Sequence, residues 1–325
     1  DHVTILSDDP GYQGRGLVHE RGFDVIPFER SGIWRTMRTS YKGVILCEPF
    51  GHYLIFGLVY KLLHPKSILS IYCCGSKTEE RAWWEELLVR IGKRWFIDHF
   101  IACTYYSAEK ILFKNAAKAE IVYCPVDVKI YKPTTGLDQK IILSIDRFRK
   151  RKNQLALIHA FKIVHEQDPE AVLHLVGDYI KMDNPDELKD YAKKVVASIE
   201  ELGLKDVVKM HGEVTDEQKI DWLSKATVFV KTSHNEMQGI IATEAVAAGV
   251  PVVAFDNSGT HEVVRDAGGI LVQHEDVDAL AQALLRAIND TSLLRSISEQ
   301  SLKSAEKYSF ENNIESFYRV VSSDK

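Results

Sequence analysis

Short apolar runs that alternate with helix-length segments limit most strongly what this chain can fold into. Each run is bounded by polar or turn-forming residues and has the length of one buried strand. Strands that alternate with helices predict parallel sheets covered by helices on both faces, so the expected fold class is α/β. The expected strands are Val3–Ser7, Val25–Phe28, Val44–Cys47, Ile68–Tyr72, Phe100–Cys103 and Ile121–Cys124, then Ile141–Ile145, Val172–Val176, Val207–Met210, Val228–Val230, Val252–Phe255 and Ile270–Val272.

The segment Tyr131–Gly136 divides these runs into two series. Its proline, threonines and glycine are typical of a linker. A chain of 325 residues is long enough for two domains of ordinary size. We therefore predict two Rossmann-like domains with doubly wound parallel sheets, 1–135 and 136–307, followed by an amphipathic helix within 308–325.

The composition is that of an ordinary soluble protein, with 45% hydrophobic and 27% charged residues. There is no run of about 18 uncharged apolar residues and no signal-peptide pattern, so neither a transmembrane span nor secretion is expected. We expect a cytoplasmic protein, with the cytoplasmic face of a membrane as the alternative. Because the chain begins with Asp1 and not methionine, the presence of further residues upstream is left open.

The cysteines are odd in number and lack the CxxC spacing of metal sites, and most lie in apolar runs. This pattern predicts reduced core residues of an intracellular protein and no metal site. The five cysteines are Cys47, Cys73, Cys74, Cys103 and Cys124.

The net charge of −5 is unevenly distributed, because the first 135 residues carry a slight excess of basic residues and the remainder is acidic. A basic first series is consistent with an anionic acceptor or a membrane surface, and equally with ordinary surface variation. The aromatic and basic segment 82–111 leaves the same choice between peripheral membrane contact and core packing. No nucleic-acid partner is expected.

Two carboxylates flank the start of a predicted helix in the second series. The apolar run Thr227–Val230 predicts a strand and Gly239–Ala248 predicts a helix, so Glu236 falls on the loop and Glu244 within the helix. The first N–H groups of a helix and the positive end of its dipole favour an anion such as a diphosphate. The two acids would instead accept hydrogen bonds from hydroxyls. This combination predicts a pocket for a nucleotide-sugar.

A basic segment follows the expected strand Ile141–Ile145. Arg147 and Lys152 would lie at the carboxyl edge of the second sheet, where open α/β sheets bind their ligands. The developing charge of a diphosphate leaving group needs fixed cations, which a guanidinium and an ammonium supply. The alternative is a solvated basic run, since other basic residues crowd the same segment.

These stretches together resemble the retaining GT-B glycosyltransferases of family 4. The resemblance rests on Glu236 and Glu244, separated by seven residues, and on the run Ala248–Ala254, with sequence AGVPVVA. Further stretches of similarity are Ser144–Asn153, Leu175–Asp178, Ser258–Gly259 and His261–Val264. The resemblance covers about residues 140–320 well and the first series weakly.

The resemblance implies a GT-B fold, with two Rossmann-like domains facing a cleft and the final helix returning to the first domain. The first domain is expected to lack its first β-loop-α unit. The implied reaction is retaining and metal-independent transfer of a hexose from a nucleotide-diphosphate sugar, without a cofactor. In it, Arg147 and Lys152 bind the diphosphate, Glu236 the donor-sugar hydroxyls, and Glu244 the ribose.

The same resemblance assigns further positions around the donor. The amides of Gly239 and Ile240 would bind a phosphate, and those of Ser258 and Gly259 the sugar or a phosphate. Gly177 and Gly212, at strand ends, would let the backbone approach the base, although turn and loop positions need glycine equally. Cys74 aligns with a family histidine near the transferred sugar and is the acceptor-side candidate; a thiol cannot act as a charged donor in its place.

Three stretches resemble most closely the mannosyltransferases that extend lipid-linked oligosaccharides: Tyr72–Cys73, Ser144–Asn153 and Val176–Tyr179. They favour mannose as the hexose and a glycan or lipid-linked acceptor. Two other interpretations stay open, namely a non-catalytic nucleotide-sugar-binding partner subunit and a nucleotide-sugar epimerase of the same architecture. A NAD enzyme is disfavoured, because no GxGxxG follows a predicted strand.

Overall fold

Two compact units make up the chain, and each is described here by itself. One comprises Asp1–Ile71, Arg81–His99 and Asp324–Lys325, and the other Tyr72–Glu80 and Phe100–Ser323. The expected domain boundary after residue 135 stays a prediction. The computed structural model describes residues 4–7, 24–27, 37–41, 43–47, 51–73, 96–112, 118–179 and 185–322.

The first series of apolar runs forms strands as predicted, and their pairing is parallel where it is described. β1 pairs with β2, β5 pairs with β6, and a four-stranded sheet has the order β3-β4-β5-β6. The last run is shorter than expected, since only Glu120–Ile121 of it is a strand. The elements are β1 (Thr4–Ser7), β2 (Asp24–Pro27), β3 (Gly43–Cys47), α3 (Gly51–Leu63), β4 (Ile68–Cys73), β5 (His99–Ala102), α5 (Tyr105–Leu112), β6 (Glu120–Ile121) and η3 (Val128–Ile130).

The second series forms a six-stranded parallel sheet with the order β12-β11-β10-β7-β8-β9. The chain adds strands outward from β7 on one side and then returns to begin the other side with β10. The carboxyl ends of the neighbouring strands β7 and β10 therefore mark the switch point of a Rossmann-like sheet. The strands are β7 (Ile141–Ile145), β8 (Val172–Val176), β9 (Val208–His211), β10 (Val228–Lys231), β11 (Val252–Phe255) and β12 (Ile270–Val272).

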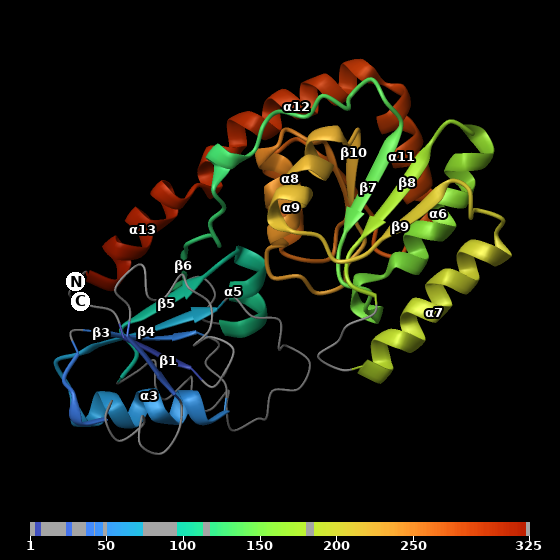
Figure 1. Ribbon diagram of the computed structural model, residues 1–325. Coiled ribbons are helices and arrows are strands. Elements are labelled where there is room, and N and C mark those ends of the chain that lie inside the picture. Colours follow the sequence, from blue (N-terminus) through green and yellow to red (C-terminus); the bar gives the residue numbers. More distant parts are fainter. Residues whose placement is uncertain are drawn as a thin grey trace. The chain divides into compact units, whose positions relative to one another are not determined.

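Helices cover both faces of this sheet, as the alternating pattern predicts. One buried cluster joins Leu157 and Phe161 of α6 to Leu284 of α11, and a second joins Leu223 of α8 to Val246 of α9. Figure 1 shows α8 and α9 on one side of the strands and α6 and α7 on the other. The helices are η4 (Lys150–Lys152), α6 (Gln154–Gln167), α7 (Pro185–Glu201), α8 (Asp216–Lys225), α9 (Ile240–Ala247), α10 (Thr260–Asp266), α11 (Val277–Asn289), α12 (Thr291–Ala305), η5 (Glu306–Tyr308) and α13 (Phe310–Ser322).

The segment with linker composition, Tyr131–Gly136, packs closely against α8 and α9. Thr134 is buried, and its N–H donates to the Ala248 carbonyl at 2.9 Å. A Cβ added to Gly136 would lie 2.0 Å from the Lys225 carbonyl oxygen. The proline, threonines and glycine therefore fit a tight backbone path along the domain surface.

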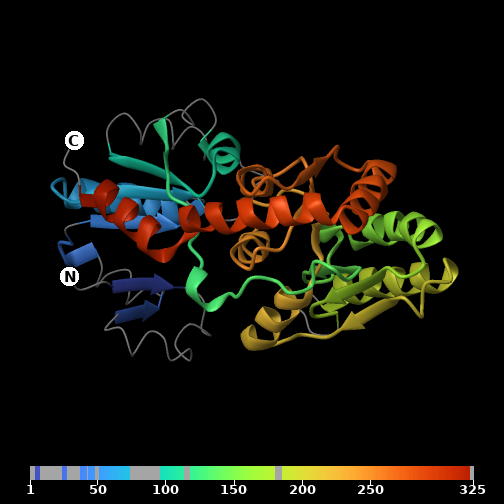
Figure 2. The ribbon, with the colours of Figure 1, turned by 90° about the horizontal axis from the view of Figure 1, so that it is seen from above.

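The chain's final helices continue from the six-stranded sheet. α12 is followed by η5 and then α13, and Figure 2 shows these C-terminal helices in red. Tyr308 of η5 is fully buried, its hydroxyl donates to Asp266 at 2.6 Å, and its carbonyl accepts from the Val126 N–H at 2.9 Å. These contacts anchor the turn between α12 and α13.

The described helices include none that is both long and apolar enough to cross a membrane. Three cysteines among the described residues form no disulfide, with Cys73 and Cys103 buried and Cys124 partly buried. This agrees with the expectation of reduced core cysteines.

Gly177 and Gly212 end neighbouring strands but differ in how much space surrounds them. Gly177 has φ +147°, and a Cβ there would lie 2.0 Å from the Asp146 carbonyl oxygen. Around Gly212 an added Cβ would meet nothing within 4 Å. Gly177 is therefore required by close backbone approach, whereas Gly212 is not.

We predict that Gly177→Ala lowers the free energy of unfolding by about 2 kcal/mol or more, because both the backbone angle and the clash oppose a Cβ. Gly212→Ala is the matched control and should leave stability nearly unchanged. Urea denaturation of both variants checks this, and equal stability of the two would contradict it.

Candidate functional site

The predicted basic segment and the Glu236 loop meet at the switch point of the six-stranded sheet. Arg147 follows β7 and is exposed, while Lys152 ends η4 and is buried. The Thr232 hydroxyl donates to the Lys152 carbonyl at 3.0 Å, and the His234 N–H donates to the Arg151 carbonyl at 2.7 Å. The structure thus brings Lys152 and Glu236 together, and their roles at a donor stay predictions.

Four charged side chains form a buried network at this point. Lys152 forms ion pairs with Asp146, at 2.6 Å, and with Glu236. Lys231 pairs with Asp146 and lies 3.8 Å from Glu236. The exposed fractions of the four side chains are 9% for Lys152, 10% for Asp146, 13% for Glu236 and 4% for Lys231. Within these four side chains two ammonium groups balance two carboxylates, and the partly exposed Arg151 guanidinium adds a further cation 3.6 Å from Glu236.

The protonation of the network follows from burial and pairing. Burial raises the pKa of Asp146 and of Glu236, but the two lysines outweigh it and hold both pKa values below the usual range. Burial lowers the pKa of Lys231, but Asp146 and Glu236 outweigh it and the pKa is raised. Burial and the neighbouring Lys231 charge lower the pKa of Lys152. Lys231 is also the more deeply buried of the two lysines, with 4% of its side chain exposed against 9% for Lys152.

The loop after Glu236 leads into α9 through a glycine in the left-handed conformation. Gly239 has φ +81°, and a Cβ there would lie 2.4 Å from the Thr260 hydroxyl oxygen. The N–H groups of Ala242 and Thr243 donate to the Gly239 carbonyl, and these are the first hydrogen bonds of the helix. The N–H groups at the start of a helix have no intrahelical acceptor and can bind an anion. Their place beside Glu236 agrees with the sequence expectation.

Two residues of this loop are held by segments far away in sequence. The side-chain amide of Gln238 accepts from the Cys124 N–H at 2.7 Å and donates to the Cys124 carbonyl at 2.9 Å. The Thr104 hydroxyl donates to the Met237 carbonyl at 2.6 Å. Both Met237 and Gln238 are buried. The loop is thereby held in place by Cys124 and Thr104.

Glu244 lies inside α9 and is buried. Its Oε1 accepts from Lys219 Nζ of α8 at 2.7 Å, and its Oε2 has no hydrogen-bond partner among the described residues. Burial, together with the Glu244 charge, raises the pKa of Tyr131. Glu244 thus keeps one buried acceptor oxygen available for a hydroxyl.

The remaining sequence candidates lie around the same sheet edge, with one exception. The Gly177 N–H contacts the His211 and Gly212 carbonyls at 3.1 and 3.2 Å, which places these two glycines side by side. The Gly259 N–H donates to the Glu236 carbonyl at 2.7 Å, and Ser258 is buried beside it. Cys74 lies outside the described residues.

The sequence analysis missed Asp146 and Lys231, although each directly ends or follows an expected strand. That position, at the carboxyl ends of the two central strands, was the available signal. It also missed Glu262, whose carboxylate oxygens accept from the N–H groups of Tyr105, at 3.1 Å, and Tyr106, at 2.8 Å. Glu262 thereby caps the N-terminus of α5, a long-range contact that no local pattern indicates.

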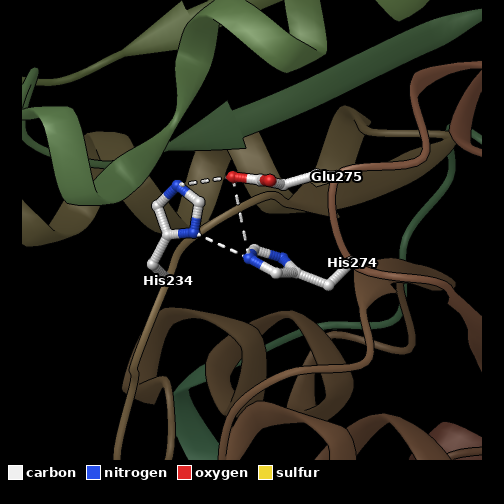
Figure 3. Close-up of side chains that lie close together, drawn as sticks. All are labelled: His234, His274 and Glu275. Atoms are coloured by element: carbon white, nitrogen blue, oxygen red, sulfur yellow. Dashed lines mark hydrogen bonds and ion pairs between the residues drawn. The ribbon is translucent and has the colours of Figure 1, made fainter.

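A second group of titratable residues was also missed, because its members are far apart in sequence. His234, His274 and Glu275 offer side-chain atoms that all lie within 4.8 Å of one another, as Figure 3 shows. Burial, and then the neighbouring His274, lower the pKa of His234. The imidazole of His234 is therefore neutral near pH 7.

We predict that Lys231→Met lowers the free energy of unfolding by about 3–5 kcal/mol, because Asp146 would remain buried without its strongest partner. Lys129→Met removes an exposed ion pair with Glu311 and should cause no measurable change. Chemical denaturation followed by tryptophan fluorescence compares the two. Equal stabilities for both variants would contradict the proposed contribution of the buried network to the free energy of unfolding.

We also predict a pH dependence for Glu236→Gln. The folded pKa of Glu236 is below its unfolded value, so its contribution to stability is present above about pH 4.3 and is lost as pH falls through the folded pKa. The variant should be less stable than the wild type at pH 7, and the difference should narrow below pH 4. Denaturant midpoints measured at several pH values check this; a pH-independent difference would count against it.

Comparison with known proteins agrees with this arrangement. The family profile described as Glycosyl transferases group 1 matches residues 128–304, more than half of the chain. A poly(glycerol-phosphate) alpha-glucosyltransferase of Bacillus subtilis is 31% identical over 195 residues, covering 59% of this chain and 27% of the relative. A D-inositol 3-phosphate glycosyltransferase of Streptomyces bingchenggensis is 27% identical over 235 residues, covering 66% of this chain and 50% of the relative. The chain thus spans half or less of the length of these relatives.

Solved structures show the same fold. HepE of Anabaena, in complex with UDP, has a TM-score of 0.83 and 19% identity, covering 99% of this chain and 91% of that chain. Sucrose-phosphate synthase from Thermosynechococcus elongatus has a TM-score of 0.72 and 18% identity, covering 98% of both chains. The two parallel sheets and these neighbours establish a GT-B fold. On the family match, the chain belongs to the glycosyl transferases group 1.

Proposed function

We propose that this chain catalyses retaining transfer of a hexose from a nucleotide-diphosphate sugar to a hydroxyl of a glycan or lipid-linked acceptor. The observation that carries the proposal is the paired Lys152 and Glu236 at the sheet's switch point, beside the start of α9. Cations, free amides and a hydroxyl acceptor together match the chemistry of a diphosphate joined to a sugar.

The diphosphate is bound by Arg147, Lys152 and the first amides of α9. Lys152 shares its two carboxylate partners with Lys231, which lies deeper and stays paired to Asp146. Lys152 can therefore turn toward a phosphate without leaving Asp146 as an unpaired buried charge. Arg147 is exposed at the end of β7 and adds a planar group that matches phosphate oxygens.

The two glutamates recognise hydroxyls. Glu236 gives up its contact with Lys152 and accepts hydrogen bonds from the donor sugar. Glu244 accepts from the ribose through Oε2, the buried oxygen that has no hydrogen-bond partner among the described residues. Lys219 Nζ pairs with the other oxygen, so the carboxylate keeps its orientation.

In the reaction, the bond between the anomeric carbon and the diphosphate oxygen breaks, and the acceptor oxygen bonds to that carbon on the same face. The acceptor proton passes to the leaving phosphate. The negative charge that develops on the diphosphate is stabilised by Arg147, Lys152 and the α9 amides, which are fixed before the reaction. This chemistry requires no metal or other cofactor.

We propose UDP-glucose as the donor and a phosphate-bearing molecule as the acceptor. HepE has been solved with UDP-glucose, and two curated relatives are named for poly(glycerol-phosphate) and D-inositol 3-phosphate. The resemblance to lipid-linked-oligosaccharide mannosyltransferases favours mannose instead, and a relative from Agrobacterium fabrum is named mannosylfructose-phosphate synthase. Membrane contact and a cytoplasmic location remain expectations from the sequence.

The proposal predicts that UDP raises the melting temperature and that UDP-glucose supports transfer. Lys152→Ala and Glu236→Ala should each lower kcat/KM by about 100-fold or more, since each removes a contact to the reacting diphosphate or sugar. Lys129→Ala, at an exposed ion pair, is the matched control and should keep full activity. Donor-consumption assays with UDP-glucose and GDP-mannose identify the donor.

The other interpretations give different results in the same assays. Nucleotide binding without any transfer or donor hydrolysis would identify a non-catalytic binder. Release of a free sugar without an acceptor, together with epimerisation, would identify an epimerase. Failure of every nucleotide to stabilise the chain would overturn the donor site itself.

A further inference from the structure

Three side chains with metal-binding atoms come together at the carboxyl edge of the six-stranded sheet. His234 lies in the loop after β10, and His274 and Glu275 lie in the turn after β12. These strands flank β11 and run parallel to it, so their carboxyl ends lie at the same edge. Figure 3 shows the two imidazoles and the carboxylate pointing toward one another.

The distances fit a small coordination sphere. His234 Nδ1 lies 3.1 Å from His274 Nε2, which lies 3.8 Å from Glu275 Oε1. Ligands about 2.0–2.2 Å from a tetrahedral zinc ion are separated by about 3.3–3.5 Å. His234 Nε2 lies 4.0 Å from Glu275 Oε1, and the ligand atoms of the three residues all lie within 4.8 Å of one another, so side-chain rotations would bring them to these separations.

We propose that His234, His274 and Glu275 bind a divalent transition-metal ion, with zinc as the best match. Two imidazole nitrogens and one carboxylate oxygen are a donor set that zinc accepts, with a further position left for water. The proposal goes beyond sugar transfer, whose chemistry uses none of these three side chains.

Asn257 supplies the second contact that a metal-binding histidine needs. Its Nδ2 lies 2.8 Å from His274 Nδ1, and its Oδ1 is buried without a hydrogen-bond partner among the described residues. Rotation of the amide would bring Oδ1 to His274 Nδ1, which would then carry the proton. His274 Nε2 would be left with a free lone pair for the ion, the usual arrangement around a metal-bound imidazole.

The backbone around the group is already ordered. The His234 N–H is bonded to Arg151, and the His274 ring packs edge-on against Phe255, with 5.6 Å between the ring centroids. Glu275 has φ +64°, and the next residue, Asp276, caps α11 by accepting from the Ala279 N–H at 2.8 Å. An ion would bind to two preformed turns, so little ordering would oppose it.

An ion at this position would connect the donor loop to the turn after β12. His234 precedes Glu236 by two residues and bonds to the segment that carries Lys152. Metal occupancy would therefore restrict the loop that presents Glu236. The site is a regulatory or stabilising one in this proposal, and its binding can be measured without any nucleotide.

The test is titration of the tag-free, metal-stripped full chain with Zn²⁺ by calorimetry and with Co²⁺ by visible absorption, in the absence of nucleotide. We expect one ion per chain. His274→Ala should weaken Zn²⁺ binding by about 100-fold or more, since it removes a direct ligand. Glu275→Gln should also weaken it and tests the site without disturbing the core, because this side chain is 66% exposed.

His159→Ala, on the exposed face of α6, is the matched control and should bind Zn²⁺ as the wild type does. Absence of stoichiometric binding would overturn the proposal, as would equal affinity in wild type, His274→Ala and Glu275→Gln. Loss of nucleotide binding has no bearing on either result, so failure of this site and failure of the proposed transfer are distinguishable.

Discussion

The buried charge network of Asp146, Lys152, Lys231 and Glu236 is the constraint on which the site depends. Each carboxylate stays ionised because lysines surround it, and each strand end at the centre of the sheet contributes one member. Lone charges at such depth would be strongly unfavourable, so the four positions depend on one another. Lys231 is the more deeply buried lysine and pairs with Asp146, whereas Lys152 is shared between Asp146 and Glu236.

The sheet's strand order explains why these residues meet. Because the chain turns back after β9 to begin the other half at β10, the loops after β7 and β10 both lie at the switch point of the sheet. The basic segment follows one strand and the glutamate loop the other. The glycines at Gly177, Gly239 and Gly259 let neighbouring backbones approach this space closely.

Much of the second sheet and of the candidate site could be predicted from local sequence. The apolar runs gave all six strands of the second sheet to within a residue at each end, and the start of α9 followed from Gly239. Lys152, Glu236 and Glu244 were predicted as site residues from their position and chemistry, and their roles stay predictions. Lys231 was not, because a lysine at the end of an apolar run resembles an ordinary solvated strand end; only the tertiary partner Asp146 shows that it is buried. The composition of Tyr131–Gly136 predicted a linker. Composition does not show that backbone groups such as the Thr134 N–H find partners in the neighbouring helices.

Gln238 depends on a residue that lies upstream of the family match. Its amide pairs with both backbone groups of Cys124, and Thr104 holds the neighbouring carbonyl, so the donor loop is secured by residues upstream of the stretch that matches the family profile. A fragment cut at residue 128 would keep the donor-side motifs from Ser144 to Val264 yet leave the buried Gln238 amide and the Met237 carbonyl without these partners. The family match therefore begins downstream of residues that hold the Glu236 loop in place. A truncated form of this protein has to include Thr104 and Cys124 to keep that loop intact.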